Sequence, residues 1–270
     1  MSRDLLDEVA QAWVDLGSRL PSDSLRLILT DVDGVITRGE GQPVELDVIE
    51  RLAAINAAAQ RDPYVPAIAL CTGRQAPYVE LMAQLTGTFL PCIFEHGCGL
   101  FFPMSFRFEF QPPDYAARLT RLRVGIDEPL IKSGRAFVQP GKEASMTLYP
   151  VGSTSVSDLF EMAKELINDF DVARNVNGVE VRPPGIDKGV GAQRVAAILG
   201  ISLESMAGVG DSDPDLSYLT RVGFSAAPDN ATQAVRQAVT YVSQKPFGAG
   251  LLEIVTLVER RNRKQTLTET

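Results

Sequence analysis

A short apolar segment that runs into two aspartates constrains the fold of this chain more than any other feature. Residues 25–30 are apolar apart from Arg26 and Thr30, and Asp31, Asp33 and Gly34 follow them. Such a run predicts a strand buried on both faces, as in a parallel sheet, whose ligands bind at the carboxyl ends of the strands. Two carboxylates at a buried edge are costly unless a cation, a proton or a basic side chain lies beside them.

Strand-like and helix-like segments alternate along most of the chain. Apolar strand patterns occupy residues 65–71, 91–94, 206–209 and 222–226, and helical patterns occupy residues 46–59, 74–85 and 187–199. This alternation predicts an α/β fold with a Rossmann-like, doubly wound parallel sheet, because right-handed crossovers return each strand to the same direction.

The pattern changes between the third strand and the Pro183–Pro184 pair. Phe106, Phe108 and Phe110 alternate with charged residues, which is typical of antiparallel strands with one exposed face. We therefore expect an α+β cap domain at 103–183, inserted into a core formed by 25–102 and 184–258. An amphipathic helix should occupy 1–24, and residues 259–270 should form a polar, frayed tail.

Composition excludes several classes of function. The net charge of −8 argues against nucleic-acid binding, which needs a clustered basic surface. No segment approaches the roughly 20 apolar residues of a membrane span. The N-terminal residues are acidic rather than basic and the three cysteines are odd in number, so a cytoplasmic protein without a membrane partner is expected. The N-terminal helix could pack on its own core or on a second subunit in a homodimer.

Polar residues gather where the predicted strands end. Parallel topology brings the Asp31/Asp33 pair, Thr72, Lys188 and the Asp211/Asp215 pair to one edge of the sheet. An aspartate can attack phosphorus to form an aspartyl-phosphate, and Mg²⁺ prefers carboxylate, water and phosphate oxygens. Thr72 and the Gly73 amide can hold phosphate oxygens, and Lys188 can neutralise the remaining charge.

Two other metal sites fit the sequence less well. A calcium loop that starts at Asp211 would place Leu216 where glycine is needed and Val222 where a bidentate glutamate is needed. Cys92, His96 and Cys98 offer three zinc ligands where four are the norm.

The four clusters, in order, resemble the four motifs of the haloacid dehalogenase superfamily. The segments are Leu-Thr-Asp31-Val-Asp33-Gly-Val, Thr72-Gly73-Arg74, Asp187-Lys188-Gly189 and Gly-Asp211-Ser-Asp-Pro-Asp215. Glu95-His96-Gly97 and Asp229-Asn230-Ala231 further resemble the Cof-like subclass with a type IIB cap, which includes sugar-phosphate phosphatases.

The resemblance implies a role for each matching residue. Asp31 would be nucleophile and metal ligand, and Asp33 would be the general acid/base with its main-chain carbonyl on the metal. Phosphate would be bound by Thr72, Gly73, Lys188 and Asn230. The remaining metal ligands would be Asp211 and Asp215. Pro214 stands where many relatives have asparagine, so no side-chain hydrogen bond is expected from that position.

The predicted cap supplies candidate specificity residues. Alternation along residues 143–149 and 179–182 puts polar side chains on one face, either over the active site or toward solvent. The candidate substrate contacts are Lys142, Ser145, Glu180 and Arg182.

Together these features predict an Mg²⁺-dependent phosphatase of small phosphorylated metabolites, most of all sugar phosphates. The alternatives are a phosphomannomutase-like phosphomutase, which would return the phosphoryl group to sugar, and a non-catalytic binding protein on the same fold.

Overall fold

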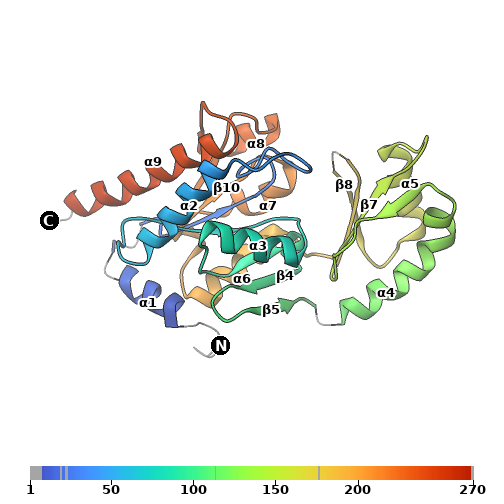
Figure 1. Ribbon diagram of the computed structural model, residues 1–270, viewed down its shortest axis with the longest axis horizontal. Coiled ribbons are helices and arrows are strands. Elements are labelled where there is room, and N and C mark those ends of the chain that lie inside the picture. The colour runs from blue at the N-terminus through green and yellow to red at the C-terminus, as the bar shows by residue number, and fades with distance from the viewer. Residues whose placement is uncertain (1–7, 19, 22–23, 113, 176, 269–270) are drawn as a thin grey trace.

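The computed structural model contains an α/β core and a smaller α+β unit that projects from it (Figure 1). It describes residues 8–18, 20–21, 24–112, 114–175 and 177–268. The core carries both ends of the described chain, and the smaller unit, hereafter the inserted unit, runs from α4 to β9.

The centre of the core is a parallel sheet with β1, Leu27–Thr30, in an interior position. The strand order is β12-β11-β10-β1-β2, and each neighbouring pair is parallel. The other strands are β2 (Ala67–Leu70), β10 (Met206–Val209), β11 (Phe224–Ala227) and β12 (Tyr241–Val242). The doubly wound α/β class predicted from the alternation of strands and helices is confirmed.

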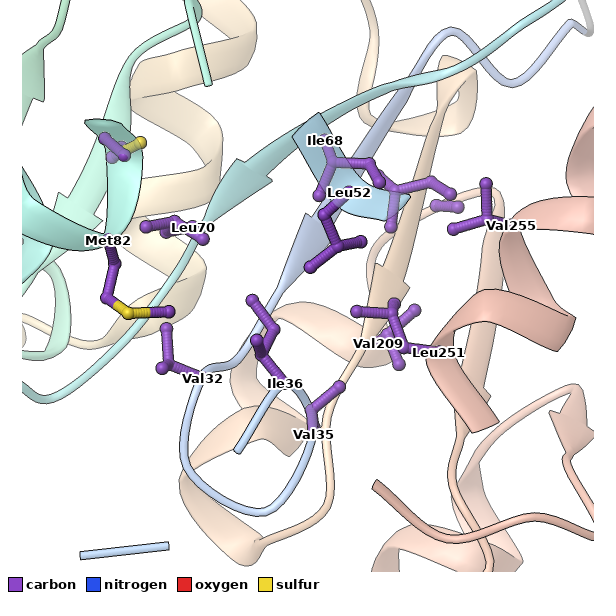
Figure 2. Close-up of a cluster of buried hydrophobic side chains, with 14 of the residues drawn as sticks. Val32, Val35, Ile36, Leu52, Ile68, Leu70, Met82, Val209, Leu251 and Val255 are labelled. Atoms are coloured by element: carbon purple, nitrogen blue, oxygen red, sulfur yellow. The ribbon is translucent and has the colours of Figure 1, made fainter. Parts of the chain in front are cut away.

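Apolar side chains bury both faces of this sheet. Ile28 and Ile68 join one core cluster, whereas Leu27 and Leu29 join the other. Figure 2 shows the first cluster, where Leu52 of α2 and Leu251 and Val255 of α9 meet Ile68 and Val209. The helices of this face are α2 (Leu46–Ala59), α3 (Ala76–Thr86) and α9 (Phe247–Thr268). The opposite face is covered by α1 (Glu8–Gly17), α6 (Lys188–Leu199), α7 (Leu216–Leu219) and α8 (Gln233–Ala238).

The third predicted strand, β3 (Cys92–Phe94), leaves the parallel pattern early. A single bridge between Cys71 and Ile93 joins it to the main sheet, and it pairs antiparallel with β4 (Gly99–Phe102), which pairs with β5 (Arg107–Phe110). The ring of Phe110 packs edge-on against Phe94 at 5.3 Å between centroids. β5 therefore packs with the core, although the predicted boundary at residue 103 assigns it to the insertion.

The inserted unit is a four-stranded antiparallel sheet with two helices. Its strand order is β6-β7-β9-β8, and Met146 and Leu148 of β7 face the unit's own apolar cluster while Thr147 faces the opposite side. Its elements are α4 (Tyr115–Ile126), a π-helical segment (Asp127–Lys132), β6 (Ala136–Val138), β7 (Met146–Pro150), α5 (Val156–Leu166), β8 (Asp171–Arg174) and β9 (Val179–Arg182). The sequence pattern missed β6 and β8, which are short and mostly half-buried or exposed.

The two ends of the described chain are anchored to the core. Trp13 of α1 packs on Phe89 at 6.5 Å between centroids, and the residues before Glu8 lie outside the described part. The expected frayed tail is instead helical as far as Thr268, because the buried Asn262 bonds the main chain of Leu25. Among the described helices, none has both the length and the apolar character that crossing a bilayer requires.

Candidate active site

A polar cleft of about 450 Å³ lies at the carboxyl ends of the core strands, beneath the inserted unit. From the core it is lined by Asp31, Asp33, Thr72, Gly73, Lys188 and Asp211, and from the inserted unit by Lys142, Asn175 and Glu180. A larger hollow of about 730 Å³ between α2 and α9 contains none of these residues. The chemistry therefore concentrates in the smaller cleft.

Asp31 and Lys188 form a buried ion pair in the floor of the cleft. Lys188 Nζ lies 3.0 Å from Asp31 Oδ2 and 2.5 Å from Asp215 Oδ1, and all three residues are buried. Burial by itself would lower the pKa of Lys188, but the carboxylates of Asp215 and Asp31 raise it, so the lysine is charged. Burial raises the pKa of Asp31, and Lys188 opposes that rise. The cation is held beside the oxygen expected to attack.

Asp215 serves this pair as a scaffold. Its Oδ2 accepts hydrogen bonds from the backbone amides of Asp211 at 3.0 Å and Ser212 at 3.1 Å, while Oδ1 accepts from Lys188. Both of its oxygens are thus engaged by protein donors. This arrangement fits a supporting role for Asp215 better than the direct metal ligation expected of it.

Asp211 offers the free coordination capacity of the site. Its buried Oδ1 has no hydrogen-bond partner among the described residues, and ligand atoms of Asp31, Asp211 and Asp215 lie within 4.8 Å of one another. Burial, followed by the charge of Asp215, raises the pKa of Asp211 to about 7. A Cβ on Gly34 would lie 2.2 Å from Asp211 Oδ2, so only glycine lets the two loops approach. The donor set fits a small divalent cation that prefers oxygen ligands.

The Thr72–Gly73 turn forms the next part of the wall. Thr72 is buried, and its Oγ1 accepts a hydrogen bond from the Arg74 amide at 3.2 Å. A Cβ on Gly73 would lie 2.3 Å from His96 Nε2, so this turn lies directly against the imidazole. The backbone here is open to a phosphate oxygen because glycine presents no side chain.

Asn230 lies behind the cleft rather than in its lining. Its Nδ2 donates to the Gly34 carbonyl at 2.9 Å, and its Oδ1 accepts from the Phe247 amide at 2.8 Å. The amide therefore joins the loop after Asp33 to the start of α9, which is a different role from the expected phosphate contact.

Asp33 is held by Arg74, the arginine that ends the Thr72-Gly73-Arg74 motif. Arg74 donates from Nε to Asp33 Oδ2 at 2.6 Å and from a terminal nitrogen to Oδ1 at 2.8 Å. This bidentate contact fixes the carboxylate plane. Residues 33 and 74 lie on separate strand ends, so the partner could not be read from local spacing.

The inserted unit contributes a second buried cluster around Glu180. Lys142 Nζ lies 2.5 Å from Thr147 Oγ1 and 3.1 Å from Glu180 Oε2. Burial alone would raise the pKa of Glu180, but the charge of Lys142 and the contact with His96 hold it below its usual range. Burial lowers the pKa of His96 to about 4, so this imidazole is neutral near pH 7. Lys142 and Glu180, two of the predicted specificity residues, thus meet over the cleft.

The other two predicted specificity residues are not among those that line the cleft. Ser145 is buried and donates to Glu95 Oε2 at 2.9 Å. Arg182 lies opposite Asp171 at the edge where β9 pairs with β8. Alternation along a strand predicts on which face of the sheet a side chain lies. It does not predict which end of the strand adjoins the cleft, because that depends on how the inserted unit packs on the core.

Glu95 joins the core to the inserted unit, and sequence reasoning assigned it no such role. Its carboxylate accepts hydrogen bonds from the amides of Glu143, Ala144 and Ser145 at 3.0, 2.9 and 2.7 Å. The residue is fully buried and adopts a positive φ of 47°. An acidic residue at the end of an apolar strand was the only available signal.

Comparisons with known proteins agree with this geometry. A family model described as haloacid dehalogenase-like hydrolase matches residues 141–254. A phosphoglycolate phosphatase of Pyrobaculum islandicum is 27% identical over 237 residues, which cover 86% of this chain and 95% of that protein. Phosphoglycolate phosphatase 1 of Saccharolobus solfataricus is 22% identical over 86% of this chain and 94% of its own length.

Solved structures share the fold over most of the chain. Protein 0175 of Thermoplasma acidophilum matches with a TM-score of 0.68 and 18% identity, covering 87% of this chain and 99% of that one. A haloacid dehalogenase-like hydrolase from Bacteroides thetaiotaomicron matches with a TM-score of 0.67 and 16% identity, covering 87% and 100% of the two chains. Motifs, geometry and relatives converge on one conclusion: the chain is an enzyme of the phosphatase type, and its residues 141–254 match the haloacid dehalogenase-like hydrolase family.

Proposed function

We propose that this enzyme is an Mg²⁺-dependent phosphatase that hydrolyses small phosphorylated metabolites through an aspartyl-phosphate on Asp31. The observation that carries the proposal is the Lys188 ammonium, which lies 3.0 Å from Asp31 Oδ2 beside the unpartnered Oδ1 of Asp211. A buried nucleophile between a fixed cation and free metal-ligating oxygens suits the attack of one anion on another.

The residues divide the reaction into two displacements. Asp31 attacks phosphorus and the bond to the leaving oxygen breaks, while Asp33 gives that oxygen a proton. Asp33 then takes a proton from water, the resulting hydroxide attacks the aspartyl-phosphate, and the bond to Asp31 breaks to release phosphate. Lys188, Thr72 and the Gly73 amide offset the charge on the phosphate oxygens. Mg²⁺, held by Asp31, the Asp33 carbonyl and Asp211, would neutralise further phosphate charge.

We further propose that the inserted unit acts as a cap that selects the leaving group. The cluster of Lys142, Thr147 and Glu180 presents both donors and acceptors, and Asn175 Nδ2 donates to Glu180 Oε1 at 2.9 Å. A cleft of about 450 Å³ can hold a sugar phosphate. The names of the relatives make phosphoglycolate a second candidate substrate. The cytoplasmic location and the homodimer stay predictions.

Phosphate release across a substrate panel tests the proposal. Phosphoglycolate, several sugar phosphates and p-nitrophenyl phosphate should release phosphate with Mg²⁺ and not after its removal by a chelator. Trapping of radiolabel on wild-type protein but not on Asp31→Asn would support the covalent step. Interconversion of sugar phosphate isomers without phosphate release would instead identify a mutase, and activity that persists in Asp31→Asn would refute the nucleophile.

A further inference from the structure

A chain of side chains runs from the inserted unit to the carboxylate of Asp33. Asp33 is gripped by Arg74 through two hydrogen bonds, at 2.6 and 2.8 Å. Another guanidinium nitrogen of Arg74 lies 3.6 Å from Glu40 Oε1, and the guanidinium carbon lies 4.8 Å from the centre of the Tyr78 ring. Asp33, Glu40 and Tyr78 therefore hold the guanidinium together.

The link continues across the cleft to the inserted unit. Tyr149 at the end of β7 donates its hydroxyl to the Glu40 carboxylate, whose oxygens lie 2.9 and 3.1 Å away. The Tyr149 ring stacks on Phe137 of β6 at 5.1 Å between centroids with an interplanar angle of 26°. Two strands of the inserted unit thus fix the position of Glu40, which lies in the loop after Asp33.

This path is separate from the contacts that join the two units near Glu95. Glu95 binds the start of β7 through the amides of residues 143–145, whereas Tyr149 lies near the other end of that strand. Movement of the inserted unit about the first contact would displace Tyr149 from Glu40. The contact between Tyr149 and Glu40 therefore depends on how the inserted unit is positioned over the cleft.

We propose that Tyr149, Glu40 and Arg74 are positioning residues that place the Asp33 carboxylate for proton transfer only when the inserted unit is seated over the cleft. The inference rests on the proposed function, because it assigns Asp33 the proton delivered to the leaving oxygen. General acid catalysis demands hydrogen-bond distance between the acid and the leaving oxygen, and small misplacements are costly. A bidentate guanidinium anchored from the inserted unit fixes the orientation of the Asp33 carboxylate, which meets the geometric part of that demand.

The leaving group provides the readout. An alkyl phosphate such as phosphoglycolate or a sugar phosphate needs protonation of its leaving oxygen, whereas p-nitrophenolate leaves without it. In single-turnover experiments, which isolate the first displacement, Tyr149→Phe should slow release of the leaving alcohol from the alkyl phosphate by about fivefold, as expected for one lost hydrogen bond. The burst of p-nitrophenol from p-nitrophenyl phosphate should stay nearly unchanged. Arg74→Ala should show the same selectivity with a loss on the order of a hundredfold. Arg74→Lys should not restore the rate, because lysine cannot make the bidentate contact.

Matched variants complete the test. Tyr115→Phe removes a hydroxyl of the inserted unit that bonds only the Asp169 carbonyl in the described structure, and it should leave both rates unchanged. Glu40→Gln combined with Tyr149→Phe should lose no more than the larger single loss, because both act through one link.

Two results would overturn the inference. Equal losses in the first displacement of the alkyl and aryl phosphates, or no loss in Tyr149→Phe, would refute the positioning role of these residues while leaving the phosphatase proposal intact. If the wild-type enzyme turns over no phosphate ester, both the proposed function and the positioning role are refuted. A normal melting temperature for each variant confirms that the losses are not those of unfolding.

Discussion

Two buried lysine–carboxylate clusters face each other across the cleft, and they differ in charge balance. In the core, Lys188 is the single cation that the described part of the chain places beside Asp31, Asp211 and Asp215. In the inserted unit, Lys142 matches Glu180, and the neighbouring His96 is neutral near pH 7. An excess of carboxylates calls for a cation, whereas a balanced pair can hydrogen-bond neutral or polar groups. The core cluster is therefore suited to metal and phosphate, and the other cluster to the rest of the substrate.

Replacing Asp31 should have the largest effect. Asp31→Asn should lower kcat on the order of ten-thousandfold, because it removes the attacking carboxylate that is held beside Lys188. Steady-state phosphate release measures it. Asp213→Asn, an exposed neighbour of the same cluster, is the control and should retain most of the rate. Comparable losses in both variants would mean that turnover depends on the local negative charge and not on Asp31 as the nucleophile.

Magnesium should stabilise the core cluster in a pH-dependent way. Because burial and Asp215 raise the pKa of Asp211 from 3.8 to about 7, the folded metal-free protein binds that proton more tightly than the unfolded chain. The contribution of Asp211 to the free energy of unfolding is therefore most favourable below about pH 4. This contribution is lost as the pH rises to about 7. Mg²⁺ binds the deprotonated form, so it should add about 3 kcal/mol at 100 times its Kd near pH 7, and less at pH 5.

Thermal unfolding with Mg²⁺ or chelator at several pH values checks this expectation. Asp211→Asn should lose most of the Mg²⁺ effect and flatten the pH dependence between pH 4 and 7, whereas Asp213→Asn should keep both. If Mg²⁺ does not change the melting temperature of the wild type at pH 7, the metal assignment is contradicted.

Neutralising the second cluster should change substrate choice. The double variant Lys142→Met with Glu180→Gln removes both charges together, which avoids leaving one charge buried alone. We expect kcat/KM on sugar phosphates or phosphoglycolate to fall roughly ten- to a hundredfold, with p-nitrophenyl phosphate much less affected.

The control for this variant is the pair Lys245→Met with Glu253→Gln. Those residues form an ion pair of 3.5 Å beside the larger hollow, away from the cleft. Uniform losses on large and small substrates in the cleft variant would show that its cluster supports the fold rather than recognition.

Ser145→Ala should have the smallest effect, and it should act on stability. The substitution removes one buried hydrogen bond to Glu95 but keeps the three backbone amides, so the expected cost is about 1 kcal/mol. Chemical denaturation measures it, and Ser133→Ala, whose exposed hydroxyl bonds the Pro129 carbonyl at 2.8 Å, is the control. A change of substrate preference without loss of stability would restore Ser145 to the specificity residues.

The local pattern of the sequence was sufficient for the core of the site. Burial on both faces makes each parallel strand a continuous apolar run, so Asp31, Thr72 and Asp211 mark strand ends directly, and Asp187 caps the helix that Lys188 opens. Parallel topology then brings these ends to one edge without any knowledge of side-chain packing. The α/β class follows from the same information.

Tertiary structure decided the contacts between segments far apart in the chain. Asp33 with Arg74, Glu95 with the 143–145 amides, and Asn262 with Leu25 each join such segments through polar groups. Hydrophobic periodicity and turn residues report only on residues close together in the sequence. They do not predict which distant donor will hydrogen-bond to a buried acceptor. Buried polar groups must be satisfied, but the packing of whole elements selects the partner. For that reason the sequence determined which strand ends line the candidate site, while the fold alone determined how the inserted unit reaches it.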